Sequence, residues 1–170
     1  LIGEASRQYA NGQHAEAAAM VAVALAISPE DAAAQHLSGL CHLALGQGEL
    51  GIAMLEKAFA TDLGNDELRV NLALAKSHHG QHQAVVDLLD NLLQRQPGAL
   101  QIYQPLAMAK WELRDKTGAI AVYRGLVDRS PHDAAAHRAL GQALVQAGDP
   151  DQAFRFLQRA ADVAHHAFIG

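Results

Sequence analysis

The spacing of helix-breaking residues constrains this chain more than any other feature of its sequence. Four glycines recur at intervals of 34 residues or twice that: Gly12, Gly46, Gly80 and Gly148. Three prolines recur on a second lattice of the same period: Pro29, Pro97 and Pro131. A fixed period of about 34 residues is typical of stacked helix–turn–helix units. The spacing therefore predicts an all-α array rather than a single globular core.

Each lattice has a conformational cause. Glycine enters the left-handed backbone region at no steric cost, so the lattice glycines are predicted to end the first helix of each pair. The residue before a proline avoids the helical region, so the prolines are predicted to end the second helix. Three residues in one later column can cap the next first helix: Asp31, Asn65 and Asp133. In the last unit, Asp149 is predicted to cap a helix that begins at Pro150.

These signals divide the chain into five units, residues 1–31, 32–65, 66–99, 100–133 and 134–167, with 168–170 as the start of a truncated further helix. Phe168 and Ile169 suggest that helix, so both ends are interpreted as cut from a longer array or protein. The fourth unit is the least regular. Arg114 replaces the turn glycine, Pro105 falls early in the first helix, and Gly125 interrupts the second. The first helix of this unit is predicted to start late or to bend, because proline is tolerated only near a helix start.

Composition excludes several classes of function. Charged residues make up 18% of the chain and the net charge is −5, which gives no electrostatic reason to expect nucleic acid or an anionic membrane as a partner. No apolar run is long enough for a membrane-spanning helix. The single cysteine, Cys41, allows no intrachain disulfide and is predicted to be a small packing residue. It is compatible with a reducing compartment such as the cytoplasm and with a secreted domain, so the compartment stays open.

No catalytic, cofactor or metal site is expected. The sequence has no nucleophile–base pair, no paired catalytic carboxylates and no glycine-rich phosphate loop, so the chain is not predicted to be an enzyme. The segment His78-His79-Gly80-Gln81-His82 invites a metal interpretation, because imidazole is a common ligand of transition metals. Gly80 marks a turn, however, which separates His78 from His82. A solvated loop is the better interpretation.

Small and bulky residues also recur in register. One small column lies inside the first helices: Ala5, Gly39, Ala73, Ala107 and Gly141. Another opens most of the second helices: Ala17, Gly51, Ala119 and Ala153. A bulky column follows one turn later: Val21, Leu55, Leu89, Tyr123 and Leu157. With these columns the sequence resembles the tetratricopeptide repeat family over nearly its whole length. It departs from the family at the Trp column, which reads Leu1, Gln35, Arg69, Tyr103 and His137, and at the Tyr column, which reads Gln8, His42, Lys76, Lys110 and Leu144.

The resemblance implies a right-handed superhelical solenoid whose first helices line a concave, peptide-binding face. On this face the residues predicted to contact a partner are His36, Leu40, Leu43, Val70, Leu74, Ser77, His78, Gln104, Met108, Trp111, Glu112, Arg138 and Gln142. The alternative is that these side chains only pack between adjacent first helices. A carboxylate clamp of the chaperone-binding type is not expected, because Arg138 is almost the only positive charge there. An asparagine ladder is not expected either, because Asn71 stands alone in its column.

The predicted function is that of a protein–protein interaction scaffold. It would bind a peptide or helical segment of a partner in an apolar concave groove. One alternative is a non-catalytic docking region of a larger enzyme, such as a glycosyltransferase. Another is self-association through exposed repeat ends.

Overall fold

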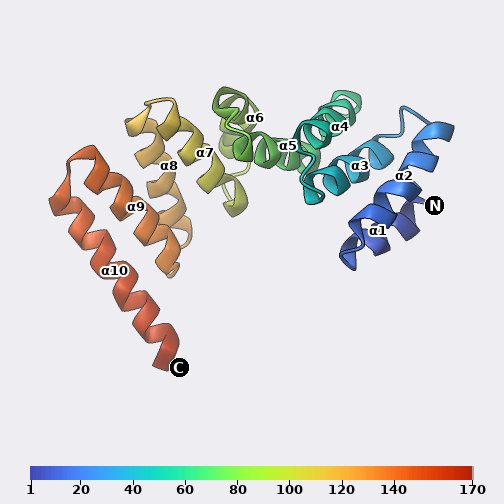
Figure 1. The fold of residues 1–170 in the computed structure, drawn as a ribbon. Helices are drawn as coiled ribbons and strands as arrows, with labels where there is room; N and C mark the ends of the chain where they lie inside the picture. Colours follow the sequence, from blue (N-terminus) through green and yellow to red (C-terminus); the bar gives the residue numbers. More distant parts are fainter. Residues whose placement is uncertain (170) are drawn as a thin grey trace. The chain divides into compact units, whose positions relative to one another are not determined.

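The computed structural model describes residues 1–169, and the side chains of residues 1–166. This part of the chain is helical throughout, and it contains no strand. It forms two compact units, one from Leu1 to Gln81 and one from His82 onward. The predicted all-α array of helix pairs is confirmed (Figure 1). The boundary between the units falls between the two helices of the third predicted pair.

The first unit contains five helices. They are α1 (Ile2–Ala10), α2 (His14–Ile27), α3 (Ala32–Ala44), α4 (Gly48–Thr61) and α5 (Asp66–His78). In this unit α2 packs against α1 and α3, and α4 packs against α3 and α5. Each helix therefore buries its apolar face mainly against its neighbours in sequence, as expected for an array.

The second unit contains the other five described helices and a short 3-10 turn. They are α6 (His82–Arg95), η1 (Leu100–Ile102), α7 (Tyr103–Glu112), α8 (Lys116–Arg129), α9 (Ala134–Ala147) and α10 (Pro150–Ile169). Here α7 packs against α6 and α8, and α9 packs against α8 and α10. Residues 168 and 169 continue the backbone of α10, which corrects the prediction that they begin another helix. Their side chains, and all of Gly170, lie outside the described residues.

The turn glycines have the predicted left-handed conformation. Their φ angles are 80° at Gly12, 75° at Gly46, 70° at Gly80 and 87° at Gly148. Arg114, which replaces glycine on this lattice, has φ 67°. Its backbone N–H donates to the carbonyl of Trp111 at 2.9 Å, just as Gly12 donates to Tyr9 at 2.9 Å. The fourth turn therefore keeps its geometry at a cost of roughly 1–2 kcal/mol for a residue that carries a Cβ.

The predicted breaks after the second helices are also present. Ser28 precedes Pro29 with φ −133° and ψ 84°, and Ser130 precedes Pro131 with φ −128° and ψ 63°. Asp62 has nearly the same conformation, with φ −143° and ψ 79°, although Leu63 follows it in place of proline. The break therefore does not depend on the proline ring.

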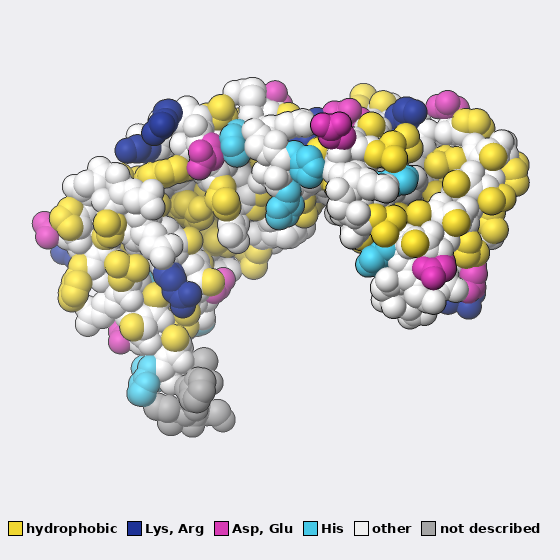
Figure 2. All heavy atoms as spheres, viewed as in Figure 1, with side chains coloured by type: hydrophobic (Ala, Val, Ile, Leu, Met, Phe, Trp, Pro, Cys, Tyr) yellow, Lys and Arg dark blue, Asp and Glu magenta, His cyan; other side chains and the backbone are white. Residues whose placement is uncertain are grey.

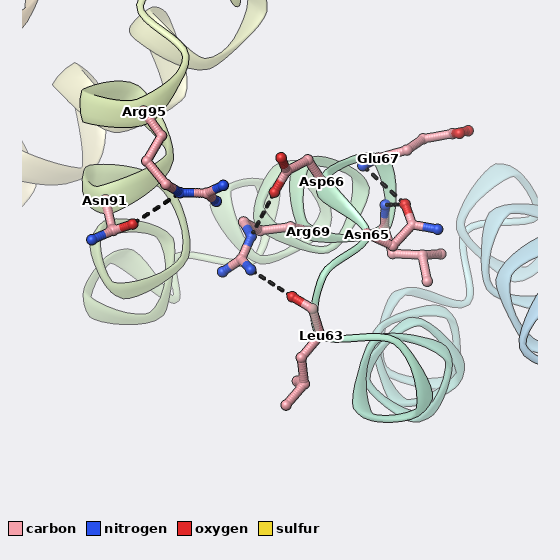
Figure 3. A network of polar contacts seen from close by, with 8 residues as sticks. Leu63, Asn65, Asp66, Glu67, Arg69, Asn91 and Arg95 are labelled. Atoms are coloured by element: carbon pink, nitrogen blue, oxygen red, sulfur yellow. Dashed lines mark hydrogen bonds and ion pairs between the residues drawn. The ribbon is translucent and has the colours of Figure 1, made fainter.

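Side-chain caps begin the first helices as predicted. The carboxylate of Asp31 accepts from the N–H of Ala34, that of Asp133 accepts from Ala135, and the amide oxygen of Asn65 accepts from Glu67 and Leu68 (Figure 3). Two second helices are capped as well. Asp149 accepts from Gln152 at 3.1 Å, as predicted. Asp115, which the sequence analysis did not assign, accepts from Gly118 at 2.8 Å.

The fourth pair is irregular in the predicted way at its first helix. The 3-10 turn η1 occupies residues 100–102, so α7 starts late and has 10 residues, against 13 in α3 and in α5. Pro105 is the third residue of α7, where a backbone N–H has no intrahelical partner to lose. Gly125, in contrast, does not interrupt α8, which is continuous from Lys116 to Arg129. A Cβ at Gly125 would lie 3.2 Å from Cε1 of Tyr103, so this glycine gives the tyrosine ring room to pack.

In four pairs, the residue at the position of the family's Trp forms a hydrogen bond. Its side chain donates to the backbone carbonyl of the residue six positions earlier, in the preceding turn. The four bonds are Gln35 to Pro29 at 2.7 Å, Arg69 to Leu63 at 2.7 Å, Tyr103 to Pro97 at 2.7 Å and His137 to Pro131 at 3.0 Å. Figure 3 shows Arg69 between this carbonyl and the carboxylate of Asp66. The four residues that stand in this column therefore share one role, which is to fasten the turn to the following helix.

The small and bulky columns meet inside two of the pairs. A Cβ at Gly39 would lie 2.7 Å from Cγ of Leu55, and one at Gly141 would lie 2.7 Å from Cγ of Leu157. The two helices of these pairs approach so closely that no side chain fits at the small position.

Candidate functional site

A groove of about 360 Å³ lies in the second unit, between α7 and α9. Four residues of α7 line it: Gln104, Met108, Trp111 and Glu112. Their spacing places them on one side of the helix. Four residues of α9 form the opposite wall: Ala139, Gln142, Ala143 and Gln146. Tyr123 of α8 also lines the groove. The groove thus brings together five of the residues predicted to contact a partner, namely Gln104, Met108, Trp111, Glu112 and Gln142.

The buried part of the groove is mostly apolar, and its exposed part combines polar side chains with Met108. Tyr123 and Ala143 are buried, Ala139 is half-buried, and the three glutamines are exposed. Met108 is 48% exposed, an unusually open position for a methionine. Trp111 is half-buried, and the ammonium of Lys116 lies 5.5 Å from the centre of its ring. The arrangement suits a ligand that has both an apolar side chain and groups that form hydrogen bonds.

Arg138 lies one residue before the α9 wall but does not line the groove; its side chain is exposed. Glu112 is therefore the only charged residue among the described groove residues. On the face of the molecule shown in Figure 2, acidic and basic side chains are scattered and form no extended patch of one sign.

In the first unit the predicted residues mostly pack between helices. His36, Leu40, Leu43, Val70, Leu74 and Ser77 are half-buried, and His78 is exposed. The amide of Asn71 donates to Nε2 of His36 at 2.8 Å and joins α5 to α3. Burial lowers the pKa of His36, and the nearby charge of Glu67 offsets part of this effect. Leu43 packs against α4, since a Cβ at Gly51 would lie 2.7 Å from its Cγ. These contacts favour the packing alternative for this unit.

Two kinds of residue were missed at the site by sequence reasoning. Tyr123 was assigned only to the bulky packing column, and Ala139 and Ala143 were assigned to no binding role. A signal for Tyr123 existed, because it is the only residue with a polar group in a column otherwise filled by Val21, Leu55, Leu89 and Leu157. The two alanines gave no signal, because alanine is frequent throughout this chain.

Other chemistry-bearing residues of the described chain do not assemble into a metal centre. Among the described residues, no three His, Cys, Asp or Glu side chains are placed to hold a metal ion. None of the described helices is both long and apolar enough to span a membrane. Cys41 is fully buried, and this burial raises the pKa of its thiol, as suits a packing residue.

Comparisons with known proteins agree with this architecture. Residues 105–165 match the family described as tetratricopeptide repeat. The MamA protein of MSR-1 has the same fold, with a TM-score of 0.88 and 19% identity over 97% of this chain and 95% of that chain. A double mutant of MamA from RS-1 gives a TM-score of 0.91 and 15% identity, over 97% and 93% of the two chains. YrrB, described as a TPR protein with an unusual peptide-binding site, gives 0.85 and 17%, over 95% and 84%. Among curated proteins none matches this chain in sequence.

Proposed function

Because residues 105–165 match the tetratricopeptide repeat family and the described chain is an array of helix pairs, we propose that this protein is a protein–protein interaction scaffold whose second unit binds a partner segment between α7 and α9. The observation that carries this proposal is the groove of about 360 Å³, which has Tyr123 and Ala143 at its buried side and Met108 and three glutamine amides at its exposed side. Grooves of this size and composition accept a few residues of an extended chain or one face of a helix. YrrB, with its peptide-binding site, supports a peptide as the class of ligand.

The scaffold role is non-catalytic and depends on a site formed before the partner arrives. The groove walls belong to two α-helices, so the partner segment bears most of the ordering entropy on binding. Met108 and Trp111 supply apolar contact area, and the amides of Gln104, Gln142 and Gln146 can donate to and accept from a peptide backbone. The same groove could recruit substrates if this chain is part of a larger enzyme. The full-length gene product discriminates between the two roles.

Self-association is a second candidate function, and a separate observation supports it. At the start of the first unit, Leu1 and Ile27 are 60% and 76% exposed around a shallow hollow between α1 and α2. Apolar side chains exposed in this way suit contact with another protein surface. A molar mass that stays monomeric at all concentrations in light scattering would exclude this candidate.

The binding role of the groove is tested with a substitution that fills it with a larger side chain. Peptides selected from a random display library on the full chain are labelled, and their affinities are measured by fluorescence anisotropy. Gln142→Phe places a ring in the groove from an exposed position, so binding should weaken at least about tenfold. Gln158→Phe makes the same change on the exposed surface of α10, outside the groove, and should leave the affinity unchanged.

Two results would contradict this site. One is equal affinity for the wild type and for Gln142→Phe, with circular dichroism showing both to be folded. The other is loss of binding through Leu74→Glu alone, because Leu74 lies on α5 in the first unit. The second result would move the binding site to that unit.

A further inference from the structure

The second helix of the fifth pair is longer than the other second helices. α2, α4, α6 and α8 have 14 residues each, whereas α10 has 20. By the 34-residue spacing, Ala164 corresponds to Ser130, the residue at which the chain leaves α8. α10 does not end there, and its extension carries His166 beyond the position where the other second helices stop. The repeat pattern alone does not account for this extension.

The extension helps to form a pocket of about 440 Å³ that is separate from the groove between α7 and α9. Its described lining consists of His132, from the turn between α8 and α9, and of Arg159, Val163 and His166, from α10. The spacing of the three α10 residues, four and then three positions, places them on one side of the helix. Val163 is half-buried and the other three are exposed. Three of the four side chains are therefore cations or can become cations, and none is acidic.

These cationic groups have no partner of opposite charge in the described chain. Neither Arg159 nor His132 forms an ion pair or a side-chain hydrogen bond with any described residue. His166 donates through Nδ1 to the backbone carbonyl of Asp162 at 2.6 Å, and this bond fixes the orientation of its ring. Its Nε2 forms no hydrogen bond with a described residue. The polar atoms around the pocket are thus available to a ligand.

The nearby carboxylates do not line the pocket. Asp133 follows His132 in the sequence, but its carboxylate accepts from the N–H of Ala135 at 2.8 Å and caps α9. Asp162 precedes Val163 on α10 and lies outside the lining. The charges of the nearby groups therefore leave an anion as the species that this pocket lacks.

The other charged groups close to the pocket in sequence act elsewhere or add to its positive character. Asp128 and Arg129, at the end of α8, lie near the phenol of Tyr103, whose pKa they shift in opposite directions. The ring of His165 lies edge-on to that of His166, with 6.3 Å between the ring centres. Protonated imidazoles beside an arginine repel one another, and a bound anion would offset this repulsion.

From this arrangement we propose that the pocket binds a tetrahedral dianion, the phosphate group of a phosphate monoester. Arg159 supplies a permanent charge and a planar fork of N–H groups that matches two oxygens of such an anion. His132 and His166 supply further donors once they are protonated, and histidine gains its proton between about pH 5 and about pH 8. Val163 provides the apolar part of the wall. The site is independent of the proposed peptide groove.

The first experiment tests the cations. Inorganic phosphate is titrated into the full chain at pH 6 and constant ionic strength, and binding is followed by NMR through the backbone amides around the pocket. Arg159→Gln should weaken binding at least about tenfold, and His132→Gln and His166→Gln about three- to tenfold each. Arg155→Gln is the matched control, because Arg155 is an exposed cation of α10 that does not line the pocket. Equal affinity of the wild type and Arg159→Gln, with both folded, would overturn the site.

The second experiment tests the histidines with sulfate, which remains a dianion over the whole pH range used. The affinity for sulfate should rise at least about fivefold between about pH 7.5 and about pH 5.5. The double variant His132→Gln/His166→Gln should remove most of this rise. His165→Gln, which removes an imidazole outside the lining, should keep it. A wild-type affinity that does not change with pH would overturn the role of the histidines.

The third experiment distinguishes the two sources of a phosphate group. Peptides that carry one phosphoserine are compared with inorganic phosphate and with the same peptides without phosphate. Affinity for the phosphopeptides at least about tenfold above that for inorganic phosphate would assign the group to a modified partner chain, and equal affinity would assign it to a small molecule. Failure of both probes to saturate the pocket would overturn the proposal.

The groove variant separates this site from the proposed function. Gln142→Phe fills the groove between α7 and α9 and should leave phosphate binding unchanged. Arg159→Gln should in turn leave the binding of unphosphorylated groove peptides unchanged. If Gln142→Phe weakened phosphate binding as much as Arg159→Gln does, phosphate would be bound in the groove and the separate pocket would be wrong.

Discussion

At the scale of single residues, the turn between the two helices of a pair shows how far geometry outranks residue type. The lattice demands a left-handed conformation at one position, and four of five turns meet it with glycine. Arg114 meets it with φ 67° and bears the steric cost of its Cβ. Its side chain is exposed and makes no described contact, so no interaction of this side chain offsets the strain.

Arg114→Gly should therefore stabilise the protein. The left-handed conformation destabilises the folded state by roughly 1–2 kcal/mol when an L-residue adopts it. Glycine removes this strain, but its more flexible unfolded chain offsets roughly 0.5–1 kcal/mol of the gain. We expect a net gain of about 0.5–1 kcal/mol in the free energy of unfolding, measured by urea denaturation. Gly148→Ala is the converse test. A Cβ there would meet no atom within 4 Å, so its expected loss of about 1 kcal/mol is purely conformational. Equal stability of all three proteins would contradict this account.

His36 makes stability depend on pH in a defined direction. Its pKa is lowered in the folded state by burial, so the unfolded chain binds a proton at a higher pH than the folded chain does. The stability that His36 contributes is therefore present above about pH 6.5 and is lost as the pH falls towards its folded pKa. His36→Gln keeps an acceptor for Asn71 and should flatten the fall in urea midpoint between about pH 7.5 and about pH 5. An identical pH profile in the variant would show that His36 does not carry this effect.

Local residue chemistry explains which features could be predicted. Turn glycines and helix caps depend on bonds spanning a few residues, so Gly46 or Asp133 could be assigned from the sequence alone. The bond from Tyr103 to Pro97 could not be assigned, because the column holds four different donors with no shared residue type. The place of Tyr123 in the wall of the groove could not be assigned either, since it depends on which groups surround this side chain in space.

At the scale of the element, the residue at which α7 begins determines whether Pro105 disrupts the helix. The same column contains Ala139 in α9, but α9 begins at Ala134 and α7 begins only at Tyr103. Proline is thus near a helix start in one case and would be in a helix interior in the other. The sequence predicted the late start from Pro105. It did not predict η1, which takes up the preceding residues.

A pair of substitutions tests this interpretation. Pro105→Ala should change the free energy of unfolding by less than about 1 kcal/mol, because no backbone hydrogen bond is gained at that position. Ala139→Pro should cost about 3 kcal/mol or more, because it removes a bond inside α9 and introduces a clash with the preceding turn. Thermal denaturation followed by circular dichroism measures both. A large loss from Pro105→Ala would mean that the proline is needed to start α7.

At the scale of the whole molecule, the chain provides one natural probe in each compact unit. The sequence contains a single cysteine and a single tryptophan; Cys41 lies in the first unit and Trp111 in the second. The raised pKa and full burial of Cys41 keep its thiol unreactive until the first unit opens. Trp111 fluorescence reports on the second unit. The lattice predicted five repeats but gave no sign of a boundary between α5 and α6, because the turn there has the same glycine as three of the other four turns.

We expect the two units to respond separately to local damage. Asp31→Ala removes a helix cap in the first unit at a cost of about 1 kcal/mol, and should expose Cys41 to thiol reagents at lower urea while moving the Trp111 transition less. Asp133→Ala removes the equivalent cap in the second unit and should give the opposite pattern. Equal shifts of both probes in both variants would show instead that the chain unfolds as one cooperative body.

The fastening bond between turn and first helix has a consequence for how such an array can change over time. Gln35, Arg69, Tyr103 and His137 all donate to the same carbonyl position. In the genetic code, histidine codons are a single base away from codons for glutamine, arginine and tyrosine. A repeat can therefore pass from any one of these donors to another through histidine without an intermediate that lacks the bond. The repeats can therefore diverge in sequence at this column while each unit keeps the hydrogen bond between its turn and its first helix.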